Sequence, residues 1–307
     1  MKNKPFIIAL IFGVLLPCML LLILSRMHIN PDVHSTRPKD GATKLRVLMT
    51  DGTVAEMLLE EYILGVVLGE MPASFELEAL KAQAVVARTY TVRANHHENA
   101  DICTDHTCCQ AYCAPKDYTG SASALQKVRK AVEDTAGEIV TYQGKPIEAT
   151  YFSCSGGRTE DAVAVWGQDV PYLQAVDSPG EEKAANYLKT TSMTAGEFAY
   201  TFGGLSGPPS NWIGDITYTK GGGVDTIQIG GTVYKGTQVR QLLGLRSTAF
   251  VITVVGSSVT ITTKGSGHRV GMSQYGADAM ALSGSDYKVI LAHYYPGTAL
   301  QGIDNAG

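Results

Sequence analysis

Hydrophobic and polar positions divide this chain into an apolar leader and a longer segment of mixed character. Residues 5–25 contain no charged residue and are dominated by Ile, Leu, Val, Phe and Met, between Lys4 and Arg26. At about 1.5 Å per residue, a helix of this length spans a bilayer core of roughly 30 Å. A cleaved signal peptide would end in small residues, and residues 23–27 offer no such site. Residues 1–26 are therefore predicted to be an uncleaved transmembrane anchor with its short N-terminus in the cytoplasm.

The chain beyond the anchor is predicted to be extracytoplasmic. Residues 27–44 contain two prolines, a glycine and scattered charges, which is typical of a linker. Residues 45–307 are predicted to form a single elaborated domain, because about 260 residues lie near the upper size of one hydrophobic core. Two intimately packed domains are the alternative for a segment of this length. The formal net charge of -4 argues against a nucleic-acid partner, which would require clustered Lys and Arg.

Two short segments rich in apolar residues open this domain. Residues 45–49 and 54–58 are predicted to be strands of a hairpin turned at Asp51-Gly52. The next periodic stretch predicts a helix capped by Ser74, with acidic residues in its first turn. The predicted buried face of this helix consists of Leu77, Leu80, Ala84, Ala87 and Thr91.

One carboxylate, Glu70, lies between an apolar run and Met71-Pro72, just ahead of that helix. Because proline disfavours helical geometry in the residue before it, Glu70 is predicted to lie in a tight loop that follows the second strand. Such a loop would hold a catalytic acid rigidly. An exposed glutamate that only pairs with a neighbour is the alternative, and sequence physics alone does not exclude it.

The remaining pattern mixes helices with strands and becomes strand-rich in its second half. It predicts α+β architecture with antiparallel sheets. The predicted helices are 121–136, ended by Gly137, then 237–243 and one from Ala277. The predicted strands are 138–142, turned at residues 144–146, and 227–229, 251–255 and 259–262.

Five soft or borderline metal ligands crowd the segment from residue 101 to residue 113. They are Cys103, His106, Cys108, Cys109 and Cys113. Zinc is the natural candidate, because thiolate and imidazole suit it and a structural site uses about four ligands. Disulfide formation is the alternative in an extracytoplasmic segment, although cysteines this close give strained geometry for several pairings.

Two further segments carry polar groups suited to binding a sugar or a peptide. Residues 151–160 read Tyr-Phe-Ser-Cys-Ser-Gly-Gly-Arg-Thr-Glu, and residues 265–277 form a glycine-rich loop that contains His268. The nucleophile motif G-x-S-x-G is missing from the first segment, so acyl-transfer chemistry is not indicated. Trp166 could stack on a sugar, but a buried aromatic at the end of a strand is the commoner occurrence.

G-E-M-P at residues 69–72, followed by E-A-L-K-A-Q-A-V-V-A-R-T-Y at 78–90, closely resembles the opening motif of the stage II sporulation protein D family. The resemblance implies a membrane-anchored lytic transglycosylase of peptidoglycan with Glu70 as its catalytic residue. Its metal motif, C-x5-C-Q-A-Y, implies that Cys103 and Cys109 bind zinc in a structural role, with His106, Cys113 or water completing the site.

The two polar segments match the other signatures of that family. The residues expected there to contact substrate are Tyr151, Ser153, Ser155, His268, Ser273 and Gln274. The resemblance further implies that the protein thins septal peptidoglycan during engulfment, in a membrane complex with a peptidoglycan amidase. The mother-cell or septal membrane is its expected location, and glycan strands freed of stem peptides are its expected substrate.

A single placed carboxylate agrees with this chemistry. Glycoside hydrolases normally need two carboxylates that flank the bond, whereas a lytic transglycosylase needs one. That residue first protonates the leaving oxygen and then accepts a proton from the muramic acid C6 hydroxyl. Two alternatives stay open: an amidase-enhancer type of wall-binding module that does not cleave glycan, and a muramidase that uses water.

Overall fold

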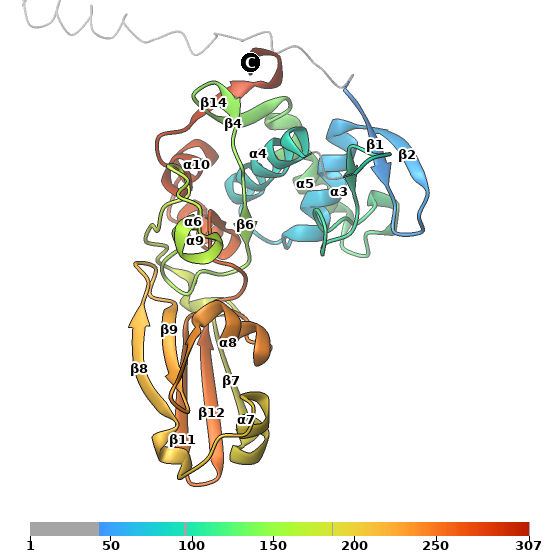
Figure 1. Cartoon of the computed structure of the whole chain (residues 1–307). Coiled ribbons are helices and arrows are strands. Elements are labelled where there is room, and N and C mark those ends of the chain that lie inside the picture. Colours follow the sequence, from blue (N-terminus) through green and yellow to red (C-terminus); the bar gives the residue numbers. More distant parts are fainter. Residues whose placement is uncertain (1–42, 95–96, 186, 307) are drawn as a thin grey trace, which may run out of the picture. The chain divides into compact units, whose positions relative to one another are not determined.

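The computed structural model describes residues 43–94, 97–185 and 187–306. The predicted anchor, residues 1–26, and nearly all of the predicted linker, residues 27–44, lie outside this part. Within it, no helix is both long and apolar enough to cross a membrane. The described chain mixes helices with mostly antiparallel sheets, as the sequence predicts (Figure 1).

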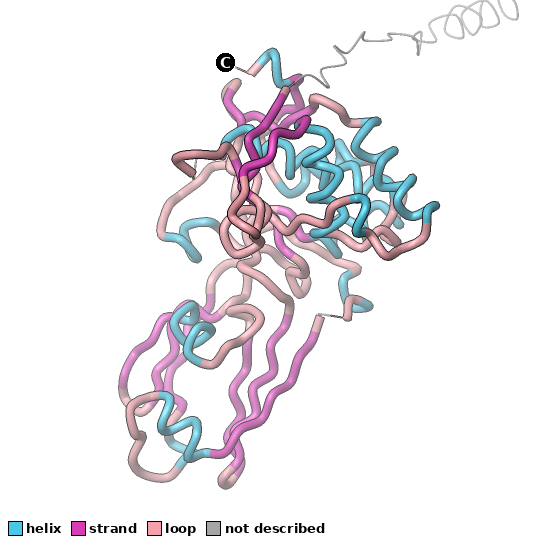
Figure 2. The backbone as a smooth tube through the Cα atoms, turned by 90° about the vertical axis from the view of Figure 1, so that its right-hand side faces the viewer, coloured by secondary structure: helices cyan, strands magenta, loops and turns pink. Residues whose placement is uncertain are grey.

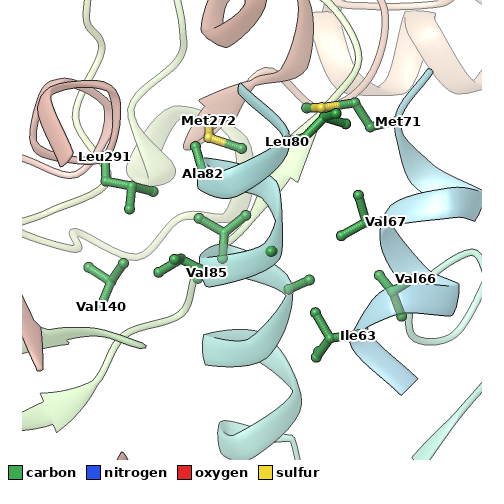
Figure 3. Close-up of a cluster of buried hydrophobic side chains, with 14 of the residues drawn as sticks. Ile63, Val66, Val67, Met71, Leu80, Ala82, Val85, Val140, Met272 and Leu291 are labelled. Atoms are coloured by element: carbon green, nitrogen blue, oxygen red, sulfur yellow. The ribbon is translucent and has the colours of Figure 1, made fainter. Parts of the chain in front are cut away.

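Helix α4, Leu77–Arg93, is the centre of the larger hydrophobic core, where other helices and a strand surround it (Figure 3). Its alanines at 79, 82, 84 and 87 are fully buried, and their small side chains let neighbouring elements approach closely. The described helices are α3 (Leu59–Glu70), α4, α5 (Ala122–Asp134), α6 (Ala162–Trp166), α7 (Ala195–Thr201), α8 (Gly236–Leu242), α9 (Gln274–Leu282) and α10 (Tyr287–Tyr294).

A buried ion pair joins α4 to α3. The guanidinium of Arg88, which is fully buried, donates to both carboxylate oxygens of Glu60 at 2.8 and 2.6 Å and to the carbonyl of Glu138 at 3.0 Å. This bidentate geometry fixes the angle between the two helices. Helix α3 therefore stands on a rigid support.

Five small sheets surround or extend this core. Their orders are β2-β1-β3, β14-β4-β5, β13-β6, β10-β9-β8 and β11-β12-β7, with parallel pairing only between β1 and β3 and between β13 and β6 among the described strands. The strands are β1 (Lys44–Leu48), β2 (Val54–Leu58), β3 (Ile102–Cys103), β4 (Glu138–Tyr142), β5 (Lys145–Pro146), β6 (Tyr151–Phe152), β7 (Leu188–Thr194), β8 (Ile213–Tyr218), β9 (Val224–Ile229), β10 (Thr232–Lys235), β11 (Phe250–Val255), β12 (Ser258–Lys264), β13 (Met272–Ser273) and β14 (Ala299–Gly302).

A second, smaller hydrophobic core belongs to the strand-rich segment from β7 to β12. It is built around Phe198, Trp212, Ile227 and Ile261. Figure 2 shows the long strands of this segment grouped apart from the helices that surround α4. The strand-rich second half predicted from the sequence therefore has its own apolar centre.

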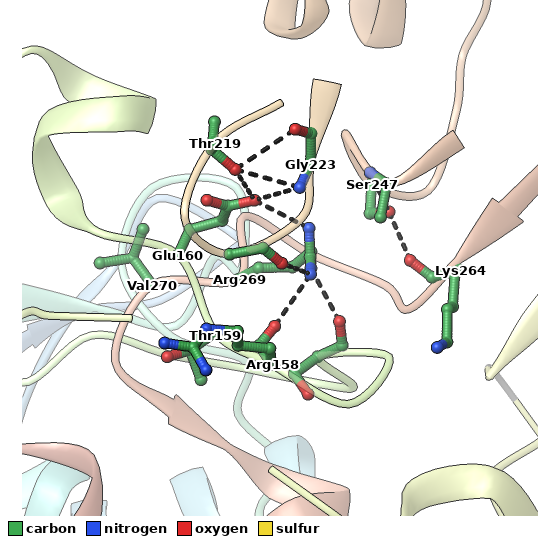
Figure 4. Close-up of polar contacts among 12 residues, drawn as sticks. Arg158, Thr159, Glu160, Thr219, Gly223, Ser247, Lys264, Arg269 and Val270 are labelled. Atoms are coloured by element: carbon green, nitrogen blue, oxygen red, sulfur yellow. Dashed lines mark hydrogen bonds and ion pairs between the residues drawn. The ribbon is translucent and has the colours of Figure 1, made fainter. Parts of the chain in front are cut away.

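The two cores meet at a second buried ion pair, shown in Figure 4. Arg269 donates to Glu160 Oε1 at 2.9 Å, and both side chains are almost fully buried. The same oxygen accepts from the backbone N–H of Gly223 at 3.0 Å, and Arg269 also donates to the carbonyl of Gly221 at 2.8 Å. Glu160 and Arg269 thus bind the loop between β8 and β9 to the larger core.

The structure corrects several local predictions. Glu70 is the last residue of helix α3, because the chain after the hairpin becomes helical at Leu59 instead of forming a loop. Proline still acts as predicted, since Met71 has extended backbone and ends the helix. Ser74 does not cap α4, whose N-cap is Glu76, and α9 starts at Gln274 rather than at Ala277. Among the described elements, the sequence analysis did not predict α6, α7, α10, β7, β10 and β14, and Trp166 ends helix α6 rather than a strand.

Candidate active site and adjoining metal centre

Two glycines of α3 explain how Glu70 acquires its partner. Gly65 and Gly69 lie one turn apart on the helix, and the segment from Ala111 to Cys113 packs directly on them. A Cβ on Gly69 would lie 2.8 Å from the carbonyl carbon of Ala111, and one on Gly65 would overlap the ring of Tyr112. Only glycine permits this approach. It brings the backbone N–H of Ala111 to the Glu70 carboxylate, where it donates to Oε1 at 2.6 Å.

The surroundings of Glu70 favour its protonated form. Burial raises the pKa of this carboxyl above the ordinary value for glutamate, while the N–H of Ala111, the hydroxyl of Tyr151 and the charge of His106 oppose the shift only in part. The position at the C-terminal end of α3 acts in the same direction as burial, because the helix dipole is negative there. A carboxyl of this kind is suited to act as a general acid.

Glu70 faces a pocket of about 390 Å³, which is within the roughly 300–1,000 Å³ range of small-molecule sites. Glu70 is the one carboxylate among the described residues that line it. No Lys or Arg is among the described lining residues either, so the pocket suits an uncharged polar ligand. The other lining residues are Tyr90, His106, Cys109, Gln110, Thr150, Tyr151, Phe152, Ser153, Gly267 and His268.

Three of the six residues predicted to contact substrate line this pocket, namely Tyr151, Ser153 and His268. The Tyr151 hydroxyl donates to Gln110 Oε1 at 3.0 Å. Both ring nitrogens of His268 have backbone partners: Nε2 lies 3.1 Å from the carbonyl of Tyr151, and Nδ1 accepts from the N–H of Val270 at 3.1 Å. Burial lowers the pKa of His268 to about 4, so the imidazole is neutral.

The other three predicted contacts, Ser155, Ser273 and Gln274, are buried and turned away from the pocket. Gln274 Nε2 donates to the backbone carbonyl of Glu70 at 3.1 Å. It therefore satisfies an otherwise orphaned carbonyl at the end of α3. Gln274 holds the catalytic candidate by its backbone and does not reach the ligand space.

Ser155 and Ser273 both donate to Glu181, a buried carboxylate that the sequence analysis did not single out. Five donors reach its two oxygens. Oε1 accepts from the hydroxyls of Ser155 at 2.9 Å, Ser178 at 2.6 Å and Ser273 at 2.6 Å. Oε2 accepts from the Cys154 thiol at 3.1 Å and from the Gly156 N–H at 2.8 Å. We call this the Glu181 network. It holds together the two polar segments that form one wall of the pocket.

A cluster of metal-ligating side chains adjoins the pocket through Cys109. The ligand atoms of His97, Cys103, Cys108 and Cys109 all lie within 4.8 Å of one another. Tetrahedral zinc with Zn–S of about 2.3 Å requires sulfur atoms about 3.8 Å apart and nitrogen about 3.5 Å from sulfur. Cys108 Sγ and Cys109 Sγ are 3.8 Å apart, and His97 Nε2 lies 3.4 Å from Cys109 Sγ and 3.7 Å from Cys108 Sγ. These four residues fit a structural zinc ion.

Cys103 and Cys109 lie together in the cluster, as predicted. The additional members are His97 and Cys108, in place of the predicted His106 and Cys113. The His106 side chain is 77% exposed and faces the Glu70 pocket, and Cys113 lies against the backbone beside α3. His97 was missed because it precedes the cysteine-rich segment, between α4 and β3 in the chain. Its position six residues before Cys103 was the available signal.

Comparisons with known proteins point to one family. The family model described as "Stage II sporulation protein" matches residues 50–142, which include Glu70 and the whole metal cluster. The stage II sporulation protein D of Bacillus amyloliquefaciens is 43% identical to this chain, over 87% of this chain and 81% of the relative. The stage II sporulation protein D of Bacillus subtilis is 42% identical, over 82% of this chain and 77% of the relative.

A relative with a different name is also similar. The amidase enhancer of Bacillus subtilis is 32% identical to this chain, over 77% of this chain but only 40% of its own length.

Proposed function

Because the chain belongs to the stage II sporulation protein D family, we propose that it is a lytic transglycosylase that cleaves peptidoglycan glycan strands during sporulation. The observation that carries the proposal is the state of Glu70. Among the described residues that line its pocket, Glu70 is the single carboxylate, and burial raises its pKa. A glycosidase mechanism that uses two carboxylates would therefore lack its second carboxylate among the described lining residues.

In the proposed reaction Glu70 acts twice. The protonated carboxyl gives its proton to the glycosidic oxygen, and the bond from that oxygen to C1 of the muramic acid breaks. The C6 hydroxyl of the same sugar then attacks C1 and loses its proton to the Glu70 carboxylate, which closes a 1,6-anhydro ring. The Ala111 N–H holds Oε1 in place throughout. No water is consumed, and Glu70 ends in the state in which it began.

The metal centre would support this site from outside it. Zinc bound by His97, Cys103, Cys108 and Cys109 would join His97, which follows α4 in the sequence, to the segment that leads to Ala111. The ion supplies structural stability when bound. The protein's own contribution is to deliver the Ala111 N–H to Glu70 through the chain that follows Cys109.

We further propose that residues 1–26 anchor the protein in the cell membrane, with the described chain outside the cytoplasm next to peptidoglycan. A peptidoglycan amidase of the same membrane complex is the proposed partner, which would supply glycan strands without stem peptides. The similarity to an amidase enhancer favours a second candidate, a wall-binding module that stimulates such an amidase without cleaving glycan.

Product analysis separates the two candidates. Purified protein should release fragments with 1,6-anhydromuramyl ends from peptide-free glycan strands, and mass spectrometry identifies them because they are lighter by one water than hydrolysis products. Reducing muramic acid ends instead would identify a muramidase. Intact strands, together with faster stem-peptide release when an amidase is added, would support the enhancer.

A further inference from the structure

The two tryptophans of this chain have contrasting environments. Trp212 is 6% exposed, stacks on Phe198 and donates its indole N–H to the carbonyl of Ser206 at 3.0 Å. It behaves as a core residue. Trp166 is 43% exposed, and among the described residues its indole N–H has no acceptor. Its exposed indole N–H is therefore available to a ligand or to water.

Trp166 is continuous with the Glu70 pocket. Its ring centroid lies 5.2 Å from that of His268, and the His268 ring lies 5.5 Å from that of Phe152. Both His268 and Phe152 line the pocket. The three rings thus form an aromatic shelf that leads from the pocket wall to the surface. Gly267 makes the shelf possible, because a Cβ there would lie 2.8 Å from Cβ of Phe152.

The support beneath Trp166 is rigid. Trp166 is the last residue of α6, and Gly167 ends the helix in left-handed geometry with φ of 78°. The start of the helix is fixed by Asp161, which accepts the N–H of Ala175 at 2.6 Å, and by the N–H of Ala162, which donates to the carbonyl of Leu173 at 3.0 Å. The indole is therefore presented at a defined place at low entropic cost.

The chemistry of the shelf selects its ligand. Both nitrogens of His268 are occupied and the ring is neutral, so the shelf offers apolar ring faces without a cation. A pyranose ring has an apolar face of C–H groups and an edge of hydroxyls. Such a sugar can cover the indole face while a hydroxyl accepts from the free N–H. A charged or wholly apolar ligand would use only part of this surface.

We propose that Trp166, with His268 and Phe152, forms a sugar-binding subsite that holds a pyranose ring of the glycan strand next to the one cleaved at Glu70. This inference rests on the proposed function, since it takes glycan as the ligand of the pocket. It assigns Trp166 to binding rather than to chemistry. Loss of the indole should weaken the binding of long strands while the proton transfers at Glu70 continue.

The test uses peptide-free glycan strands as the probe and the full chain as the protein. Trp166→Ala should raise KM about tenfold with kcat changed less than twofold, and Trp166→Phe should restore most of the affinity. An Ala variant that keeps the parent KM would overturn the subsite. If the parent protein neither binds nor cleaves the strands, the proposed function falls and the subsite with it.

A second measurement does not depend on the folding of a variant. In the parent protein acrylamide should quench the fluorescence of exposed Trp166, whereas buried Trp212 is shielded. Addition of glycan strands should protect the quenchable fraction. Cleavage of the strands at the normal rate with no such protection would overturn the subsite alone.

Discussion

The Glu70 pocket and the Glu181 network both centre on one carboxylate, yet they differ in how much of that carboxylate the protein satisfies. Glu181 receives five donors and is 1% exposed. Glu70 accepts one short backbone hydrogen bond, at 2.6 Å, has the Tyr151 hydroxyl as its other polar neighbour, and faces a pocket of about 390 Å³. A saturated carboxylate organises structure, whereas an undersatisfied one in partly buried surroundings retains the ability to exchange a proton.

The two regions also depend on different neighbours. The Glu181 network joins η3, residues Glu181–Lys183, to the start of α9 and to α10, where Tyr294 lies 2.6 Å from the hydroxyl of Ser178. The Glu70 pocket depends on the segment after the metal ligands, which carries Ala111. Gln274, next to Ser273, connects them by holding the carbonyl of Glu70. Because the two regions rest on different segments, changes in them should have distinguishable effects on activity and on stability.

The largest effect is expected from Glu70→Gln. Because the amide cannot donate an acidic proton, the rate of glycan cleavage should fall by at least about 10²–10⁴-fold. The fold should persist, since the Gln carbonyl can still accept from Ala111. The measurement is initial rate on peptide-free strands alongside a thermal unfolding curve. Glu133→Gln, an exposed position on α5, is the matched control and should retain the parent rate.

Glu181→Gln should mainly lower the stability of the fold, whereas Glu70→Gln mainly lowers the rate of cleavage. One carboxylate oxygen becomes an amide, which leaves buried donors without an acceptor at about 1–3 kcal/mol each. A loss of about 3 kcal/mol in the free energy of unfolding is expected in denaturant titration. Exposed Glu182 offers the matched control, Glu182→Gln, with no measurable change. A stable Glu181→Gln protein that lacks activity would mean that Glu181 acts in the chemistry.

Loss of the metal should disturb the Glu70 pocket and spare the Glu181 network. His97→Ala and Cys108→Ser should reduce bound zinc from near one per chain to near zero, measured by elemental analysis. Activity should fall about 10–10²-fold, because a misplaced Ala111 N–H no longer fixes Glu70. His106→Ala and Cys113→Ser should keep the metal, and zinc loss in these two instead would restore the ligand set predicted from the sequence.

The smallest expected effect is on stability as a function of pH. The pKa of Glu70 is raised in the folded protein, so between about 4.3, its unfolded value, and the folded pKa the native state binds more protons. Stability from this residue is therefore complete below the unfolded pKa and decreases as pH rises through the folded one. At pH 7 Glu70→Gln should raise Tm by roughly 1–3 °C, and the difference should vanish below pH 4. A lower Tm for the variant at pH 7 would show that the charged form is the stabilised one.

The sequence predicted much of the fold because its signals are local. The hairpin of β1 and β2 follows from Asp51-Gly52 between two short apolar segments, and α5 lies within the helix predicted over residues 121–136. Helix α3 was missed because its all-apolar run, Ile63 to Leu68, has no helical period to distinguish it from a buried strand. Strand β7 was missed because it is mostly exposed and its residues show no alternation of apolar and polar positions.

For the candidate site, the motifs shared with the family predicted that Glu70, Tyr151, Ser153 and His268 lie together, and all four line one pocket. They also predicted Cys103 and Cys109, which are two of the four residues in the candidate metal cluster. Only the tertiary structure decided that His97 and Cys108 complete the cluster, that Ser155 and Ser273 serve Glu181, and that Gln274 holds a backbone carbonyl. These relations join residues up to 204 positions apart. The physical reason is that motifs record which residue types are needed, whereas the direction of each side chain is set by which buried donor and acceptor must be satisfied when distant segments pack together.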